Sequence, residues 1–568
     1  MFRTITPGTQ SFVRLRKNNY FYLDKTGFIK EWWDSGIDAT LITRPRRFGK
    51  TLMLDTVRTF FAPEFSGRSD LFEGLEIWKH EEFRNMQGTI PVIFLSFADI
   101  KSNTCENTIK LINSRLVRIY NAFSHFLDLD LLLDTERTQF SSVQVSMDLA
   151  TAQDSLLCLS EYLTRQGCEK PIILLDEYDT PLQEAWLNGY WDELIDFIRG
   201  FFNTTFKSNP FLGRGLITGI TKVAHESIFS DMNNIEVITV TSDSYSKYFG
   251  FTENEVFSAM DEYGLTSKDE VKQWYDGFTF GQQKEIYNPW SIINFIKNNK
   301  FSPYWADTSS NALVGEIIAH GDESIKRDTE NLLKGDSIIT GINENIVFSQ
   351  LYTNNESIWS LLLAAGYVKP IKFYADKNAY EITLTNYESL IIMRNRISEW
   401  FNKASTSKND FLHALLNNDI DEMNEFMTDI IESTFSFFDT GKNKAEQFYH
   451  AFVLGLIVDF KEIYNIRSNR ESGHGRYDIC MFPKKTGDRG IVIEFKVMKQ
   501  NIENSLKETC TNALKQIKNK HYINDLLKNK VSDENIYVYG FAFRGKEVLI
   551  CGGAEKKLDW ATIPGMKD

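Results

Sequence analysis

At 568 residues the chain is too long for one hydrophobic core, and we expect about three or four domains of ~100–200 residues each. Hydrophobic residues make up 42% of the sequence and charged residues 25%, which is the profile of a soluble globular protein and excludes disordered and fibrous classes. The net charge of -14 argues against a general nucleic-acid binder.

Export and membrane insertion are both unsupported by the sequence. Residues 1–10 contain no apolar core followed by small residues, and no segment approaches ~18 consecutive apolar residues. The six cysteines form no C-x-x-C pair, so they predict neither a zinc ribbon nor a disulfide framework. We therefore expect a cytoplasmic protein without a membrane partner, in which the cysteines are buried as small hydrophobic residues.

The first expected strand leads into a turn of the kind that holds a phosphate. Gly49, Lys50 and Thr51 stand between an apolar strand at residues 41–43 and an apolar helix at residues 51–61. In such a turn, backbone N–H groups at the helix N-terminus converge on a phosphate, the lysine reaches the β- and γ-phosphate oxygens, and the hydroxyl takes one Mg²⁺ position. The pattern predicts binding of a nucleoside triphosphate such as ATP, although Gly-Lys-Thr alone also fits a basic helix N-terminus.

A second apolar run ends in two carboxylates. Residues 171–175 are Pro, Ile, Ile, Leu and Leu, and Asp176 and Glu177 follow them. A buried parallel strand of this kind delivers acidic side chains to the carboxyl edge of a sheet. We expect Asp176 to hold Mg²⁺ through water and Glu177 to polarise the attacking water. A strand ending in two acids can be ordinary surface, but both halves in this order favour an ATPase-type site.

Strands and helices alternate throughout this part of the chain. Short apolar runs predict further strands at residues 90–97 and 213–222, and longer patterns predict helices at residues 103–126 and 156–165. The alternation predicts a parallel sheet with helices on both faces. Polar residues at the end of the last strand are candidates for sensing the γ-phosphate, with a simple strand end as the equal alternative: Thr218, Thr221 and Lys222.

The middle of the chain is predicted to be helical, with aromatic-rich loops over residues 223–305. We expect these aromatic side chains to fill a packed interface rather than to stack on bases. Residues 360–367 predict a helix, and residues 368–373 and 380–385 predict two alternating strands. A helix followed by a hairpin is the back half of a winged helix, which can bind DNA or serve as a structural lid. The unpatterned polar residues 403–410 mark the approach to a domain boundary.

A second set of polar residues lies on expected strands near the C-terminus. Asp478 starts one strand, and Glu494 and Lys496 lie on the next. Because side chains alternate along a strand, Glu494 and Lys496 share a face, and adjacent strands would bring all three groups together. Two neighbouring carboxylates can bind Mg²⁺, which polarises a phosphodiester, while the lysine orients the water or stabilises the phosphate charge.

The flanking helices offer further candidates for this second site. Glu446 on the preceding helix and Gln516 on the following one fit it, and Glu471 competes with Glu446. The opposite interpretation is that these acids are salt-bridged surface residues.

The C-terminal part of the chain differs in charge from the rest. Residues 441–568 carry 22 Lys and Arg against 16 Asp and Glu, whereas residues 1–440 carry 41 Lys and Arg against 61 Asp and Glu. The basic part of an acidic protein is therefore its C-terminal end.

Five short motifs stand along the chain: Arg44-Pro-Arg-Arg-Phe-Gly-Lys-Thr51, Leu175-Asp-Glu-Tyr-Asp-Thr-Pro181, Glu226-Ser-Ile-Phe-Ser230, Trp274-Tyr-Asp-Gly277 and Tyr287-Asn-Pro-Trp-Ser291. Together they resemble the bacterial AAA-ATPase-like family that carries a PD-(D/E)XK nuclease-like domain at its C-terminus. The resemblance covers nearly the whole chain. It implies ATP and Mg²⁺ as cofactors and nucleic acid as a partner of the C-terminal domain.

The chain departs from the general patterns at two positions. Arg44 stands where G-x-x-x-x-G-K-[ST] has its first glycine, but Arg-Pro-Arg-Arg before the Gly-Lys is typical of the family. The resemblance adds Arg46 and Arg47 to the expected nucleotide-binding residues. At the second site, Tyr477 takes the place of the proline in the PD-(D/E)XK core, and absence of that proline is common in the superfamily.

Pattern and resemblance together imply an α/β chain of three parts. These are an N-terminal P-loop NTPase domain with a parallel sheet at residues 1–235, a helical lid and winged-helix-like region at residues 236–400, and a restriction-endonuclease-like α/β domain at residues 401–568.

Two functions stay open. One is an ATP-coupled, Mg²⁺-dependent nuclease, acting on DNA before RNA. The other is a regulatory STAND-like ATPase whose nuclease-like domain only binds nucleic acid or a partner protein. A homo-oligomer is an option for either.

Overall fold

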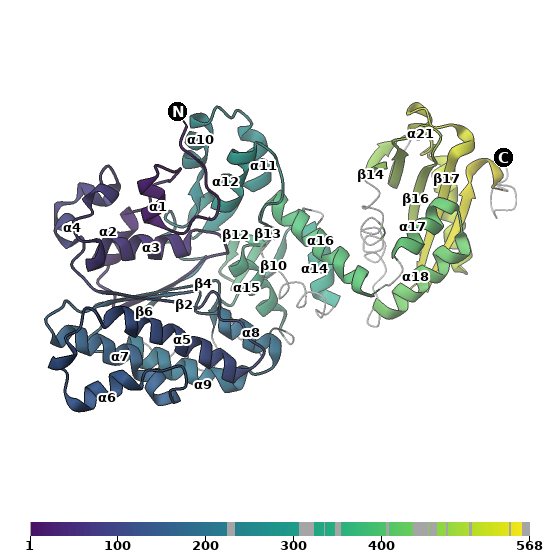
Figure 1. The fold of residues 1–568 in the computed structure, drawn as a ribbon. Helices are drawn as coiled ribbons and strands as arrows, with labels where there is room; N and C mark the ends of the chain where they lie inside the picture. Colours follow the sequence, from purple (N-terminus) through teal and green to yellow (C-terminus); the bar gives the residue numbers. More distant parts are fainter. Residues whose placement is uncertain are drawn as a thin grey trace. The chain divides into compact units, whose positions relative to one another are not determined.

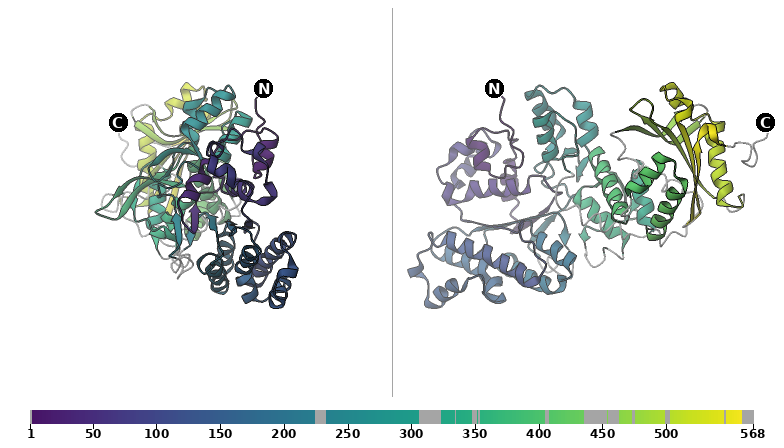
Figure 2. Two further views of the ribbon diagram at one scale, coloured as in Figure 1. Left: turned by 90° about the vertical axis from the view of Figure 1, so that its left-hand side faces the viewer. Right: turned by 45° about the vertical axis from the view of Figure 1, so that its right-hand side comes forward.

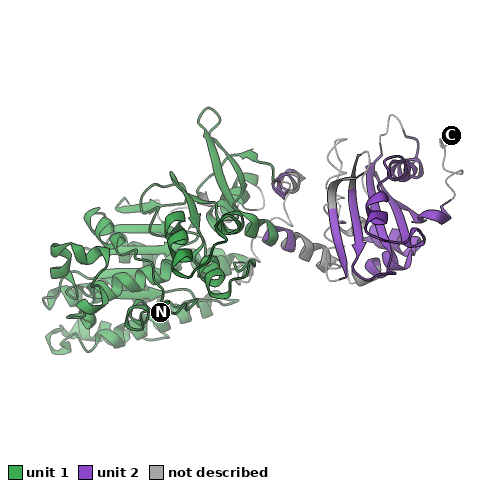
Figure 3. Cartoon of the chain, turned by 90° about the horizontal axis from the view of Figure 1, so that it is seen from above, with its two compact units in different colours: residues 1–317, 335–391 green, residues 318–334, 392–568 purple. Residues whose placement is uncertain are grey.

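The computed structural model describes residues 2–223, 233–305, 323–333, 335–346, 351, 354–404, 408–434, 453, 463–472, 475–498, 503–544 and 547–558. The chain divides into two compact units (Figure 3), one made of Met1–Ile317 with Gly335–Ile391 and the other of Ile318–Lys334 with Ile392–Asp568. The motif at residues 226–230 lies outside the described residues. The predicted division into three domains stays a prediction.

A five-stranded parallel sheet forms the centre of the first unit. Its inner strands are apolar runs buried on both faces, as expected where helices cover both sides of a parallel sheet. The strand order is β2 (Val92–Ser96), β3 (Ile172–Asp176), β4 (Arg214–Gly219), β1 (Ala39–Thr43) and β6 (Ile235–Ile238). The predicted parallel sheet is confirmed, and it includes β6, which lies within the region predicted to be helical.

Helices cover both faces of this sheet (Figure 1). Above it in that view lie α1 (Phe12–Lys17), α2 (Gly27–Asp34), α3 (Lys50–Phe61) and α4 (Glu81–Met86), and below it lie α5 (Cys105–Phe123), α6 (Asp134–Ser142), α7 (Leu149–Arg165), α8 (Thr180–Asn188) and α9 (Trp191–Phe202). The right-hand view of Figure 2 shows the same two layers. Helix α7 begins before its predicted start, because the Asp148 carboxylate caps it by accepting from the Thr151 N–H at 2.9 Å.

Helices and a small antiparallel sheet follow the parallel sheet. The helices are α10 (Glu253–Glu262), α11 (Lys268–Tyr275) and α12 (Pro289–Asn298), and the sheet has the order β7 (Phe251–Thr252), β9 (Gln283–Tyr287) and β8 (Phe278–Phe280). Several aromatic side chains of this region are packed inside it, as expected. Tyr275, Tyr287 and Phe295 are all fully buried in one hydrophobic cluster with residues of α10 and α11.

The predicted helix and hairpin are present after this region. They are α15 (Asn355–Ala365), β12 (Val368–Tyr374) and β13 (Ala379–Leu384), and β10 (Ile338–Thr340) pairs with the outer side of β13. A short parallel pair joins β5 (Lys222–Val223) to β11 (Asn345–Ile346). Helix α16 (Tyr387–Ala404) follows the hairpin and passes from the first unit into the second at residue 392, and α14 (Glu323–Leu333) belongs to the second unit.

The second unit contains a mixed five-stranded sheet between helices. Its strands stand in sequence order, β14 (Tyr464–Ser472), β15 (Gly475–Pro483), β16 (Gly490–Val497), β17 (Ile536–Arg544) and β18 (Glu547–Ala554). Only β16 and β17 pair in parallel among these, because α20 (Leu506–Asn519) and α21 (Asn524–Lys528) connect them. Helices α17 (Lys408–Asn417) and α18 (Ile420–Thr434) pack on the face that carries Ile491, Ile493 and Phe495, and α20 packs on the face that carries Val492.

The structure contains a disulfide that the cysteine spacing does not predict. The structure joins Cys510 of α20 to Cys551 of β18 in a disulfide, with the two Cα atoms 6.3 Å apart. The two residues are 41 positions apart and belong to no short motif, so the sequence offered no signal for the pair. Among the helices that the structure describes, none is long and apolar enough to cross a membrane.

Candidate functional sites

The turn between β1 and α3 has the backbone that phosphate binding needs. Gly49 precedes α3 with φ of 82°, a left-handed conformation that a glycine adopts without strain. Arg47 also has a positive φ, of 65°, which is uncommon for a residue with a side chain. The first N–H groups of α3 therefore lie at a sharply bent turn at the carboxyl end of a central strand, where open α/β sheets bind ligands.

Arg44 explains how the turn forms without its first glycine. Its guanidinium is fully buried and donates to the Thr43 carbonyl at 2.9 Å and to the Thr239 carbonyl, just after β6, at 2.6 Å. It also lies over the Phe280 ring, 4.5 Å from the centroid. Burial lowers the pKa of Arg44 to about 9. The side chain is thus part of the protein core and leaves the turn itself clear.

Lys50 lies across this turn. Its ammonium donates to the carbonyls of Arg44 at 2.8 Å and Pro45 at 2.9 Å. Burial lowers the pKa of Lys50 to about 8, and the carboxylates of Glu177, Asp179 and Asp176 oppose that change. The ammonium is therefore near Asp176 and Glu177, which were predicted to act with it, and also near Asp179.

Thr51 and Asp176 are in direct contact. Thr51 Oγ1 donates to Asp176 Oδ2 at 2.8 Å, and Thr218 Oγ1, near the end of β4, donates to Asp176 Oδ1 at 2.7 Å. Burial raises the pKa of Asp176, while the two hydroxyl donors lower it. A hydroxyl and a carboxylate are oxygen donors of the kind Mg²⁺ takes in phosphate sites, so this pair fits the expected metal. Of the three sensor candidates, Thr218 is the one that contacts a predicted metal residue.

Glu177 and Arg46 lie beside this group. The Glu177 backbone has φ of 51°, and its carboxylate accepts from Thr180 Oγ1 at 3.3 Å. Burial lowers the pKa of Arg46, and the Glu177 and Asp179 carboxylates oppose that change. The strand end thus turns sharply after Asp176, and the Glu177 carboxylate is near enough to Arg46 to affect its pKa.

Asp179 is a buried acid that the sequence analysis did not single out. Its Oδ2 accepts from the backbone N–H groups of Ile220 and Thr221 and from Thr221 Oγ1, each at 3.0 Å. Burial raises the pKa of Asp179, and these donors lower it. Asp179 therefore fixes the loop after β4, and the hydroxyl of Thr221 is committed to it. The signal available was its place in Asp176-Glu-Tyr-Asp179.

A cavity opens over the turn. Its volume is about 690 Å³, within the range of about 300–1,000 Å³ for small-molecule and cofactor pockets. Arg47 stacks its guanidinium on the Trp290 ring, 4.6 Å from the centroid, at the wall of the cavity. The structure brings most of the predicted nucleotide residues to this cavity, namely Arg46, Arg47, Gly49, Lys50, Thr51 and Glu177.

The second predicted site lies where β15 and β16 pair. Ile479 is opposite Ile493 in this antiparallel pair, which places Asp478 beside Glu494. Asp478 Oδ2 accepts from the Phe495 N–H at 2.8 Å. Glu494 is 1% exposed and Lys496 Nζ lies 3.4 Å from its Oε1. The two side chains share the face of β16 that α20 covers, as the alternation predicts.

Gln516 and Tyr522 complete the described part of this site. Gln516 Nε2 donates to Glu494 Oε1, and Tyr522 OH lies 3.2 Å from the same nitrogen. Burial raises the pKa of Tyr522, with the Glu494 and Asp478 carboxylates adding to the effect. Tyr522 was not predicted. It lies just after α20, where a single tyrosine gives no local signal of its neighbours.

Two acids were predicted to compete for one further position at this site. Glu446 lies outside the described residues, and Glu471 is described only by its backbone, on β14 opposite Arg476 of β15. The choice between them stays a prediction.

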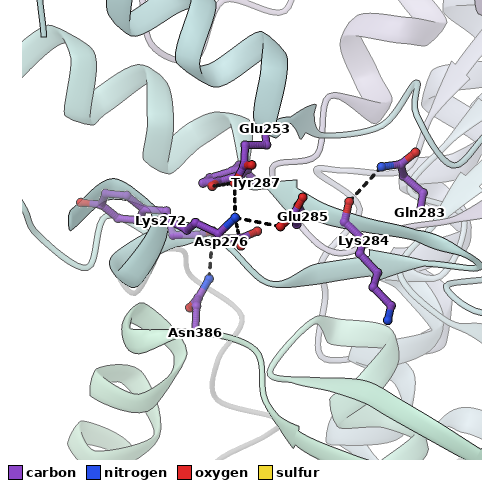
Figure 4. A network of polar contacts seen from close by, with 9 residues as sticks. Glu253, Lys272, Asp276, Gln283, Lys284, Glu285, Tyr287 and Asn386 are labelled. Atoms are coloured by element: carbon purple, nitrogen blue, oxygen red, sulfur yellow. Dashed lines mark hydrogen bonds and ion pairs between the residues drawn. The ribbon is translucent and has the colours of Figure 1, made fainter. Parts of the chain in front are cut away.

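A third acidic group lies among the helices of the first unit (Figure 4). Oxygens of Glu253, Asp276 and Glu285 come within 4.8 Å of one another. The ammonium of Lys272 lies between them and donates to Glu253 and, at 2.7 Å, to Glu285. Because the Lys272 ammonium already pairs with these carboxylates, we interpret the cluster as an ion-paired structural group and not as a metal site.

Comparison with known proteins gives two family matches and one relative. Residues 6–229 match the profile of the family described as predicted AAA-ATPase, and residues 444–552 match that of the PD-(D/E)XK nuclease superfamily. An uncharacterized protein in the vnfD 5' region of Azotobacter chroococcum mcd 1 is 26% identical over 314 residues. That alignment spans about half of each protein, 55% in both cases. The chain therefore combines an N-terminal AAA-ATPase-like domain with a C-terminal domain of the PD-(D/E)XK nuclease superfamily.

Proposed function

We propose that this protein binds and hydrolyses ATP at the cavity over the β1–α3 turn, and that its C-terminal domain is a Mg²⁺-dependent nuclease acting on nucleic acid, with DNA as the first substrate to test. The observation that carries the ATPase proposal is the contact between Thr51 and Asp176, 2.8 Å from oxygen to oxygen. It brings together two residues that are far apart in the sequence and that we assign to one nucleotide site. The family matches at both ends of the chain support the combined function.

In the ATPase site, each polar group has a distinct task. The N–H groups at the start of α3 bind phosphate oxygens, and Lys50 neutralises charge on the β- and γ-phosphates. Thr51 and Asp176 would hold Mg²⁺, which would supply positive charge against the phosphates. Glu177 accepts a hydrogen bond from the attacking water and orients it. Arg46 lines the same cavity as Glu177 and can stabilise charge that develops on the γ-phosphate.

In the nuclease site, Asp478 and Glu494 supply the carboxylate oxygens for the metal. Mg²⁺ bound there would polarise the scissile phosphodiester and favour a deprotonated water. Lys496, 3.4 Å from Glu494, offers an ammonium for the charge that develops on the phosphate. Gln516 holds the Glu494 carboxylate in place through its amide N–H. The excess of basic residues in the C-terminal part of the chain suits a polyanionic substrate.

The test is to incubate the full chain with Mg²⁺ or Mn²⁺, with and without ATP, against linear duplex, supercoiled circular and single-stranded DNA and against RNA. We expect metal-dependent cleavage of DNA, with a rate that changes when ATP is present. ATP hydrolysis without cleavage under every condition would refute the nuclease part and favour the regulatory STAND-like alternative. A Glu494→Ala variant purified in parallel controls for a contaminating nuclease, because equal cleavage by both proteins would assign the activity to the contaminant.

A further inference from the structure

The first turn of α16 carries a buried carboxylate. Glu388 is 0% exposed, and its oxygens accept from Ser291 Oγ at 2.8 and 3.0 Å and from the Trp305 N–H at 2.7 Å. Burial raises the pKa of Glu388 to about 7 against the effect of these donors. A buried acid with fixed donors is costly to displace, since moving one partner leaves a polar group unsatisfied. Glu388 therefore holds the starts of α12 and α16 together.

The turn of α12 that Glu388 holds is also in contact with the phosphate-binding turn. Asn288 caps α12 by accepting from the Trp290 N–H at 2.9 Å, and its amide donates to the Arg46 carbonyl at 3.3 Å. The Trp290 ring lies under the Arg47 guanidinium at the cavity wall. The motif Tyr287-Asn-Pro-Trp-Ser291 thus contacts the β1–α3 turn through Asn288 and Trp290 and contacts α16 through Ser291.

The other motif of this region holds the same end of α16. Asn386 donates to the Tyr275 carbonyl at 3.2 Å and caps α16 by accepting from the Ser389 N–H at 2.9 Å. Figure 4 shows Asn386 beside the group around Lys272 and Asp276. The Tyr387 ring packs edge-on against Trp274, with centroids 4.8 Å apart. The motif Trp274-Tyr-Asp-Gly277 therefore fixes the start of α16 from the side of α11.

Gly277 shows how closely the Trp274–Gly277 motif approaches the backbone just before α16. A side-chain carbon at this position would lie 2.1 Å from the Thr385 carbonyl oxygen, and the residue has φ of 129°. Only glycine fits, because any side chain would collide with the backbone just before α16. The two motifs thus converge on residues 385–389.

Helix α16 is continuous from Tyr387 to Ala404, and from Ile392 onward it belongs to the second compact unit. We propose that Glu388 is a positioning residue of the nucleotide site, and that its bond to Ser291 couples nucleotide binding to α16, the helix that leads into the nuclease-bearing unit. The inference rests on the proposed binding of ATP over the β1–α3 turn. When a bound triphosphate orders that turn, Asn288 and Trp290, which contact the turn, become more ordered as well. The hydrogen bond from Ser291 then restricts the motion of Glu388 at the start of α16.

Hydrogen exchange with mass spectrometry on the full chain, with and without ATP and Mg²⁺, tests this coupling. In the unmodified protein we expect ATP to slow exchange both in the β1–α3 turn and at the start of α16. Ser291→Ala removes the donor but not the nucleotide contacts. We expect it to keep protection of the turn and to lose at least roughly two thirds of the ATP-dependent protection of α16.

ATP affinity, measured by calorimetry, gives a second readout. We expect Ser291→Ala and Glu388→Ala to weaken ATP binding roughly three- to tenfold, and Glu388→Gln, which keeps an acceptor oxygen, to fall between them and the unmodified protein. The matched control is Ser337→Ala, which removes a hydroxyl that donates to Glu381 at 2.6 Å on the hairpin and does not line the cavity. It should leave ATP affinity and α16 protection unchanged. Thermal melting of each variant checks folding.

The outcomes separate the two proposals. Protection of the turn without protection of α16 in the unmodified protein would overturn the coupling and leave ATP binding intact. Identical behaviour of Ser291→Ala and Ser337→Ala would also overturn it. Absence of any ATP effect on the turn of a folded protein would overturn both the coupling and the proposed function.

Discussion

Thr51 and Asp176 are 125 residues apart in the sequence, yet their side-chain oxygens lie 2.8 Å apart at the carboxyl edge of the parallel sheet. Thr218 binds the other oxygen of the same carboxylate at 2.7 Å, so three segments meet at Asp176. The contact exists because β1, β3 and β4 are neighbours in the sheet, and their carboxyl ends lie at one edge.

Lys50→Ala should weaken ATP binding or hydrolysis by at least roughly tenfold, because the lysine neutralises charge on the β- and γ-phosphates. Equilibrium titration with ATP and a steady-state phosphate-release assay measure the two effects. Lys30→Ala is a suitable control, because Lys30 is paired with Asp34 on the surface of α2. Unchanged ATP binding and turnover in Lys50→Ala would remove the phosphate-binding assignment of this turn.

Glu177→Gln should keep ATP affinity within about twofold and slow hydrolysis by roughly 10²-fold or more, because it removes the group that activates water and leaves Asp176 on the metal. Single-turnover hydrolysis measured beside ATP titration separates the two effects. A loss of affinity with normal turnover of bound ATP would instead place Glu177 in binding.

Several features of the sites were accessible from local sequence. The strands of the parallel sheet are short apolar runs that end in polar residues, and the alternation of Glu494 and Lys496 on β16 follows from strand geometry. Gln516 lies on an amphipathic helix that must cross from β16 to the parallel strand β17. In each case one segment carries both the signal for its structure and the chemistry of its residue.

Other features depend on partners far along the chain. The buried Arg44 is satisfied by the carbonyl of Thr239, and Asp179 by the backbone after β4, 42 residues away. In the sequence, Glu388 is one acid at the start of a helix. Its contact with Ser291, seen in the structure, shows that it is buried and joins α16 to α12. Such polar groups are recognisable only when the tertiary partners that compensate their burial are known.

Arg44→Gly, which restores the glycine of the general phosphate-binding pattern, should destabilise the protein by on the order of 3 kcal/mol, because it removes charge-assisted hydrogen bonds and stacking from a buried site. Urea unfolding measures the change. Arg68→Ala breaks an exposed pair with Asp70, should change stability far less, and serves as the comparison. A stable Arg44→Gly protein with tighter ATP binding would mean that the arginine only obstructs the turn.

Glu388 should make stability fall as pH rises. Burial raises its pKa from an ordinary 4.5 to about 7, so between these values the folded protein binds a proton that the unfolded chain does not. The stability from this proton is fully present below about pH 4.5 and is lost as pH rises through about 7. Tyr275, whose pKa burial also raises, stays neutral throughout this range.

Glu388→Gln removes this titration. Relative to the unmodified protein, the variant should gain up to about 3 kcal/mol in unfolding free energy between pH 5 and pH 8. Urea unfolding of both proteins at unit steps of pH gives the difference. Curves that stay parallel over this range would contradict a raised pKa at Glu388.

At the second site, Asp478→Ala and Glu494→Ala should each abolish cleavage without loss of ATP hydrolysis, because each removes a metal carboxylate. Two acids this close repel one another when no metal is bound, so losing one should not cost stability. Lys496→Ala should slow cleavage but retain metal binding, since its charge acts on the transition state.

Three measurements test these effects. Nicking of supercoiled plasmid at fixed Mg²⁺ measures cleavage, calorimetric titration with Mn²⁺ measures metal binding, and thermal melting reports folding. Lys528→Ala on α21 is a charge-matched control outside the site. A folded Glu494→Ala protein that binds Mn²⁺ as tightly as the unmodified protein would contradict the assignment of Glu494 to the metal, whatever its cleavage rate.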